Sequence, residues 1–294
     1  MSASGAPRWT PPSLAAVEEG GGGASERSRG GRVGRPVTGA VFSAFALLAA
    51  ASVTPVAADV SLRWQAGSAA STPMLAEYLV DSNVVSDFIE LVSENFRFET
   101  PLVVAIGAGG GPDYEAPTNT IRLPYDYLER AVRAQATLLA AESDGDGEEA
   151  LAVRRALDVI EYTLYHLLGH ALAGSDGIEV EELAEALSSW VVLGHWPGGA
   201  AEWRRVSVSF AQASQRLDGP LSDYWHAHGL HAARERLLAC WIIGRDTGEV
   251  PLSSLPNAEA RQEECRARWI ALDADARERL DGVLHEDAPL RLER

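Results

Sequence analysis

Apolar residues recur along this chain with two different periods, and each period predicts a different kind of element. Residues 84–96 (VVSDFIELVSENF) carry apolar side chains at helical spacing and are predicted to form a helix. Residues 101–106 form a short run rich in β-branched side chains that ends in a glycine-rich stretch, and residues 119–123 alternate in character. Both patterns are typical of strands. We expect the two strands to pair as a hairpin around the loop at 111–114.

Beyond Pro124 the helical period dominates, with glycine-containing polar breaks between the periodic segments. The pattern predicts one α+β domain, mostly helical, with a small β-hairpin or sheet near its start, from about residue 74 to 287. The helices are expected over residues 125–142, 148–173, 179–193, 202–217, 228–243 and 258–272.

The N-terminal region differs from the rest of the chain. Residues 1–36 are rich in Gly, Pro, Ser and Arg with few apolar side chains, a composition typical of disorder. Residues 37–54 are apolar and small, follow two arginines and precede the sequence PVAA, so residues 37–58 fit a signal peptide cleaved before Asp59. We expect an exported protein, periplasmic or extracellular. The alternative is that residues 37–54 are retained as a membrane anchor.

The net charge limits the kinds of partner that this chain could bind, and the two cysteines bear on the compartment in which it folds. The whole chain carries a net charge of −17; without residues 1–58, which hold five Arg and three acidic residues, 20 Arg would face 39 Asp and Glu, a charge of −19. Such a charge opposes binding to nucleic acid or to an anionic membrane. Cys240 and Cys265 are spaced too far apart for a CxxC motif. After export they would form one disulfide, whereas in a reducing compartment they would be two buried thiols.

The candidate chemistry begins with the sequence HLLGH at residues 166–170. It has the frame of the zinc-peptidase motif HExxH, in which two histidines at i and i+4 share one helix face and the glutamate is the general base. His166 and His170 therefore fit two ligands of a zinc ion. Leu167 stands where the glutamate belongs, and it cannot accept a proton.

A catalytic zinc site needs a third protein ligand. Carboxylates cluster on the next predicted helix, where Glu181 and Glu185 share a face at i, i+4. One of them would bind the metal and the other would hold a histidine in place. The alternative is that the two histidines are ordinary buried or surface residues, and that the carboxylates only suit the start of a helix.

Several segments resemble, in the same order, a family of bacterial proteins described as putative metallopeptidases, DUF4344. The resemblance runs from about residue 80 to 270 and implies a zincin-like helical core, with Glu181 and Glu185 falling on two acidic positions of the family. The matching segments are LYHLLGHAL at 164–172 against FxHELGHAL, NTIRLPYDYL at 119–128 against ITLCYEL, EELAE at 181–185 against EEDAAD, YWHAHGL at 224–230 against FWDEHSL, CWIIG at 240–244 against CWVYG, and LPNAEARQEEC at 255–265 against LPxxRAxxCxxE.

The departures from this family bear on activity. The motif glutamate is replaced by Leu167, and the cysteine of ITLCYEL is replaced by Leu123. His228 falls on a family histidine and is the candidate catalytic residue, to stabilise an oxyanion or orient water; alternatively it is a packed or helix-capping histidine. We expect a zinc-metallopeptidase-like protein that is weak or inactive towards a peptide or protein substrate. The alternatives are an active metallopeptidase with a non-standard base and a metal-free helical binding protein.

Overall fold

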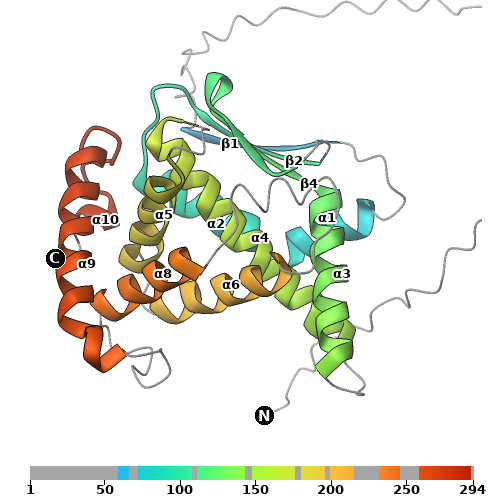
Figure 1. The fold of residues 1–294 in the computed structure, drawn as a ribbon. Coiled ribbons are helices and arrows are strands. Elements are labelled where there is room, and N and C mark those ends of the chain that lie inside the picture. Colours follow the sequence, from blue (N-terminus) through green and yellow to red (C-terminus); the bar gives the residue numbers. More distant parts are fainter. Residues whose placement is uncertain are drawn as a thin grey trace, which may run out of the picture. The chain divides into compact units, whose positions relative to one another are not determined.

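The structure of this protein is a computed structural model that describes residues 59–65, 72–107, 111–142, 148–175, 180–195, 199–214, 232–245 and 258–292. The described part is mostly helical with one small mixed sheet near its start, as predicted (Figure 1). The helices are α1 (Thr72–Asp81), α2 (Val84–Asn95), α3 (Tyr125–Glu142), α4 (Glu148–Ala173), α5 (Glu181–His195), α6 (Gly199–Ser214), α8 (Ala232–Arg245), α9 (Ala258–Leu280) and α10 (Pro289–Leu292).

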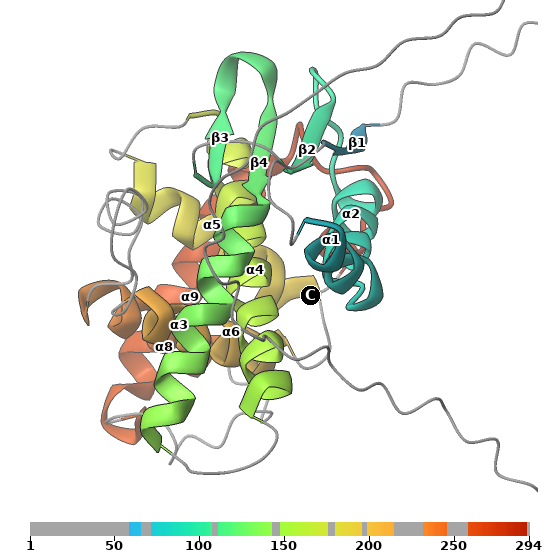
Figure 2. The same ribbon diagram turned by 90° about the vertical axis from the view of Figure 1, so that its right-hand side faces the viewer.

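The sheet corrects the predicted hairpin. Its order is β1 (Val60–Trp64), β2 (Leu102–Gly107), β4 (Thr120–Pro124), β3 (Asp113–Glu115), and β2 runs parallel to β4, with Val103 opposite Thr120. The hairpin partner of β4 is the short strand β3, which pairs antiparallel to it (Figure 2). Three residues are too few to show a period of two, so β3 was missed, and β2 was paired with β4 in the wrong direction. Strand β1, parallel to β2, was not predicted either.

The central strands are buried, and this fixes which side chains face the helices. Leu102, Val104 and Ile106 on β2 and Ile121 on β4 are fully buried in the hydrophobic core. β4 continues directly into α3, so the sheet and the helices are joined without a loop (Figure 2). Helix α4 contacts both β4 and β3 and so lies beneath the sheet.

Helix α4 is the central element of the helical part, in contact with α2, α3, α5 and α6 (Figure 1). Its bounds match the predicted range of 148–173, and it ends where Gly174 adopts a left-handed conformation with φ of 68°. A glycine accepts that conformation without steric cost and so ends the helix. Helix α5, by contrast, runs past Gly194 to His195, and α9 continues to Leu280, beyond the predicted ends.

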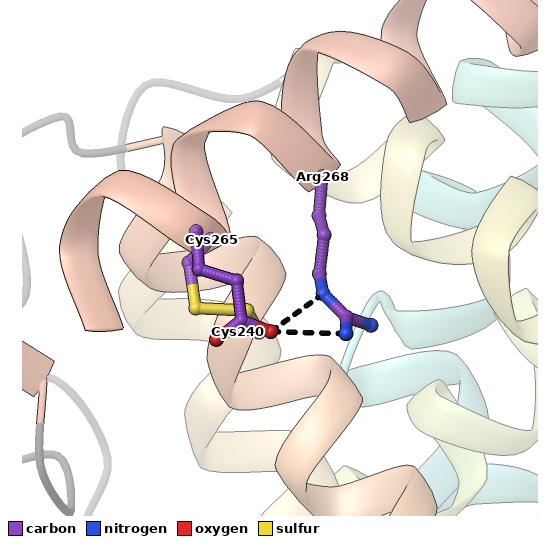
Figure 3. The surroundings of a disulfide bond; sticks show 4 residues. Cys240, Cys265 and Arg268 are labelled. Carbon is purple, nitrogen blue, oxygen red and sulfur yellow. Dashed lines mark hydrogen bonds and ion pairs between the residues drawn. A yellow bond between two sulfur atoms is a disulfide. The ribbon is translucent and has the colours of Figure 1, made fainter.

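A disulfide joins Cys240 on α8 to Cys265 on α9, as predicted (Figure 3). Both cysteines are fully buried, and Arg268 lies beside them on α9, where it pairs with Glu264. The close approach of the two helices requires Gly244, because a Cβ there would stand 2.2 Å from the carbonyl oxygen of Cys265. No helix within the described ranges has the length and apolar character needed to cross a membrane.

Candidate metal centre

The two histidines of the HLLGH motif lie on the face of α4 that packs against α5. His166 and His170 are one helical turn apart, both are about 1% exposed, and their ring centroids are 4.9 Å apart. Gly169 between them makes the close packing possible, because a Cβ there would stand 2.0 Å from the carbonyl oxygen of Ala184. The motif glycine thus sets the distance between the two helices at the site.

Helix α5 brings Glu181 to both histidines. One carboxylate oxygen of Glu181 lies 3.2 Å from Nε2 of His166, and the other lies 3.2 Å from Nε2 of His170. One ligand atom from each of the three residues can be chosen so that all lie within 4.8 Å of one another. Within the described part of the chain this is the one group of three metal-binding side chains that converges in this way.

Two further contacts, made by the Nδ1 atoms, orient the rings of His166 and His170. Nδ1 of His170 lies 3.1 Å from the backbone carbonyl of Ser175, which can only accept a hydrogen bond. Nδ1 of His166 lies 3.1 Å from Oε2 of Glu185, on the turn after Glu181. When a histidine that donates through Nδ1 is neutral, its lone pair is on Nε2, so the Nε2 atoms that face Glu181 could then serve as metal ligands.

Tyr162 extends this arrangement and was not predicted from the sequence. Its hydroxyl donates to Oε2 of Glu185 at 2.8 Å, and its ring stacks on His166 with centroids 6.2 Å apart. Tyr162, His166 and His170 follow one another at intervals of four residues, so they lie along one face of α4. That spacing is a signal visible in the sequence. Tyr162 and Glu185 together hold the His166 ring in one orientation.

Burial and charge act in opposite directions on His166. Burial lowers its pKa, but hydrogen bonds and negative charge from Glu181 and Glu185 outweigh burial and raise the pKa above its ordinary value. Two carboxylates thus favour positive charge at this position. The same negative field would favour a bound cation.

The donor set fits a zinc ion. Two imidazole nitrogens and one carboxylate oxygen are a known protein ligand set of catalytic zinc, and ligands at about 2.0–2.2 Å from one tetrahedral ion stand about 3.3–3.6 Å apart. Each of the two contacts of 3.2 Å ends on a different oxygen of Glu181, and one ligand atom from each of the three residues lies within 4.8 Å of the other two, so the three donors converge on one point. His166, His170 and Glu181 are therefore the residues that could hold the metal.

Leu167 stands where the HExxH motif has its glutamate. Leu167 is fully buried and belongs to the hydrophobic core. Glu161, the nearest carboxylate before the motif on α4, ion-pairs with Arg205 of α6 and so faces away from the histidines. The candidate catalytic residue His228 lies outside the described residues.

A second cluster of charged side chains lies between α4 and α6. It was not predicted from the sequence. Arg205 contacts Asp158 and Glu202 and lies 3.1 Å from an oxygen of Glu161. Burial and the neighbouring Glu202 raise the pKa of Glu161 to about 8. A cavity of about 600 Å³ adjoins this cluster and is lined also by Tyr165 and Asp87.

Comparison with known proteins agrees with the resemblance. The model of one family, DUF4344, described as putative metallopeptidase, matches residues 64–277. No curated protein and no solved structure matches this chain. The family match spans β2, β4 and helices α1 to α8, together with most of α9, and it includes both histidines and both glutamates of the site. The chain therefore belongs to DUF4344, a family of putative metallopeptidases.

Proposed function

We propose that this protein is an exported, zinc-binding metallopeptidase-like protein whose site lacks its general base, so that it has little or no peptidase activity. The observation that carries the proposal is the convergence of His166, His170 and Glu181 in a buried position on two packed helices. Family membership supports the reaction class, because the family is described by metallopeptidase chemistry.

Zinc would supply Lewis-acid polarisation of a peptide carbonyl at this position. The chain's own residues would bind and orient: Nε2 of His166, Nε2 of His170 and a Glu181 oxygen as ligands, with Glu185 and the Ser175 carbonyl fixing the two rings. The step that this chain would perform poorly is proton transfer from the attacking water. Leu167 has no group that accepts a proton, and loss of a general base costs about 10²–10⁴-fold in rate.

Metal analysis of the purified protein tests the binding part of the proposal. We expect about one zinc per chain in the parent and loss of zinc in the His166→Ala and Glu181→Gln variants. Glu182→Gln is the matched control, because Glu182 neighbours Glu181 but is exposed. Equal zinc content in the parent and in His166→Ala would refute the ligand assignment.

The proposal of export rests on residues 37–58 and is supported by two observations. The buried disulfide suits an oxidising compartment. Strand β1 begins at Val60, directly after the expected cleavage point, and the Asp59 carbonyl accepts a hydrogen bond from the Leu102 amide. N-terminal sequencing of the secreted protein should begin at or near Asp59. Recovery of the uncleaved chain in the membrane fraction would favour the anchor over residues 37–54.

A further inference from the structure

Tyr162 lies one helical turn before His166 on α4, and its hydroxyl contacts the same carboxylate that holds the His166 ring. The hydroxyl donates to Oε2 of Glu185 at 2.8 Å, and Nδ1 of His166 lies 3.1 Å from that same oxygen. Tyr162 and Glu185 are both fully buried. The three side chains therefore form a continuous line of hydrogen bonds that ends on one of the candidate metal ligands.

Glu185 contacts the His166 ring at the nitrogen that does not face Glu181. Nε2 of His166 lies 3.2 Å from Glu181, whereas Glu185 contacts Nδ1. A carboxylate at Nδ1 fixes the orientation of an imidazole ring and makes Nε2 a better metal ligand, and removing such a carboxylate typically weakens metal binding by about 10–100-fold. Glu185 is therefore placed to orient a ligand of the metal.

The Tyr162 hydroxyl limits the rotation of this carboxylate. The last torsion of a glutamate side chain has a broad energy minimum, so the bond to His166 by itself leaves the carboxylate free to turn. The tyrosine ring is held by aromatic packing against α6, where its centroid lies 5.1 Å from that of Trp203 and 4.2 Å from that of Phe210. A donor on a fixed ring thus gives the Glu185 carboxylate a second fixed contact.

The second histidine of the motif is held by backbone groups. Nδ1 of His170 lies 3.1 Å from the carbonyl oxygen of Ser175, and the Ser175 amide donates to the His170 carbonyl at 3.2 Å. These contacts belong to the turn at Gly174 that ends α4. A change in the side chain of Tyr162 should therefore act on the metal centre through His166.

We propose that Tyr162 is a positioning residue of the candidate metal centre, which acts through Glu185 to hold His166 and so raises the affinity of the site for zinc. This proposal rests on the zinc binding proposed above. The hydroxyl has this role, whereas the packing of the ring on Trp203 and Phe210 contributes to the stability of the fold. Loss of the hydroxyl should weaken zinc binding while the ring stays in place.

The zinc affinity of the full chain, measured by competition with a chromophoric chelator, tests this inference. We expect Tyr162→Phe to bind zinc about 3–10-fold more weakly than the parent, and Glu185→Ala about 10–100-fold more weakly. Tyr127→Phe is the matched control, because Tyr127 is equally buried and its hydroxyl is hydrogen-bonded to Thr163 of α4 rather than to Glu185. Urea unfolding of the metal-free proteins should show a similar loss of stability in both tyrosine variants. A difference in zinc affinity between them then separates positioning from packing.

A double variant tests whether Tyr162 acts through Glu185. When Tyr162→Phe is introduced into Glu185→Ala, it should cost no further zinc affinity, because the acceptor of the hydroxyl is already gone. Equal zinc affinity of Tyr162→Phe and Tyr127→Phe, or a fully additive loss in the double variant, would overturn this inference and leave the proposed ligands standing. Absence of zinc binding by the parent would overturn both.

Discussion

Gly169 of α4 lies so close to Ala184 of α5 that a Cβ on Gly169 would stand 2.0 Å from the Ala184 carbonyl oxygen. This contact lies between the two pairs that make up the candidate metal centre, His170 with Glu181 and His166 with Glu185. The glycine of the HLLGH motif therefore acts on the site through helix packing. It permits the separation of α4 and α5 at which Glu181 reaches both histidines.

Replacing Gly169 with a larger residue should move α4 and α5 apart and so disrupt the candidate metal centre. The added Cβ of Gly169→Ala would clash with backbone atoms of Ala184, which cannot move aside as the end of a flexible side chain can. We therefore expect the unfolding free energy to fall by at least about 1–3 kcal/mol. Zinc binding should weaken in the same variant. Urea unfolding and metal titration measure the two effects. Gly282→Ala is the control, because nothing lies within 4 Å of a Cβ at that position; an equal, small effect of both substitutions would contradict the packing role.

Restoring the motif glutamate tests the proposal of a lost general base. Leu167→Glu should raise zinc-dependent cleavage of a denatured protein substrate by about 10²-fold or more over the parent. Leu168→Glu is the matched control, because Leu168 is as fully buried as Leu167 but occupies the next position of the helix. Circular dichroism must show that both variants fold. Strong zinc-dependent cleavage by the parent itself would refute the loss of the base, and no gain in Leu167→Glu would mean that further residues of the site have changed.

The disulfide should stabilise the pair α8 and α9. It closes a loop with a sequence separation of 25 residues, and the chain-entropy model gives about 3 kcal/mol for a loop of that order. We expect the double variant Cys240→Ser with Cys265→Ser to lose about that much unfolding free energy, measured by urea unfolding. Thiol titration of the unfolded, unreduced parent should find no free thiol. Detection of two thiols would contradict the bond.

Glu161 should make stability depend on pH. Burial and Glu202 raise its pKa to about 8, from the ordinary value of 4.5 that applies to the unfolded chain. The folded protein then holds a proton that the unfolded chain releases, so this contribution is complete below about pH 4.5 and is lost as the pH rises through about 8. The groups around the carboxyl are Asp87 on α2, Asp158 and Arg154 on α4, and Glu202 and Arg205 on α6.

The variant Glu161→Gln is neutral at every pH and should remove this part of the dependence. We expect its unfolding free energy to exceed that of the parent by an amount that grows as the pH rises from about 4.5 to about 8 and stays constant above that, since burial and Glu202 oppose the charged carboxylate of the folded parent. Thermal unfolding across a pH series measures the difference. Glu94→Gln, at an exposed position of α2, should leave the pH profile of the parent unchanged. Parallel curves for the parent and Glu161→Gln would show that Arg205 keeps the carboxylate charged in the fold.

By itself, the sequence determined those features that depend on residues close together in the chain. The bounds of α3 and α4 agree with the hydrophobic period, because helical hydrogen bonds and side-chain contacts join residues three or four positions apart. The pairing of His166 and His170 on one face follows from the same period. The carboxylates of α5 were recognisable as candidates because Glu181 and Glu185 repeat at the same interval.

Tertiary structure decided everything that depends on residues far apart in the chain. The direction of β2 against β4 follows from the hairpin of β3 with β4, and the place of β1 follows from pairing across about forty residues, which no local period encodes. The roles of Glu181 and Glu185 follow from the register of α5 on α4, which the contact of Gly169 with Ala184 permits. The ion pairs of Arg205 with residues of α4 likewise exist only once α6 packs on α4. The spacing of apolar side chains is a property of a single helix or strand. The register and direction of two elements depend on which of their surfaces are buried against each other.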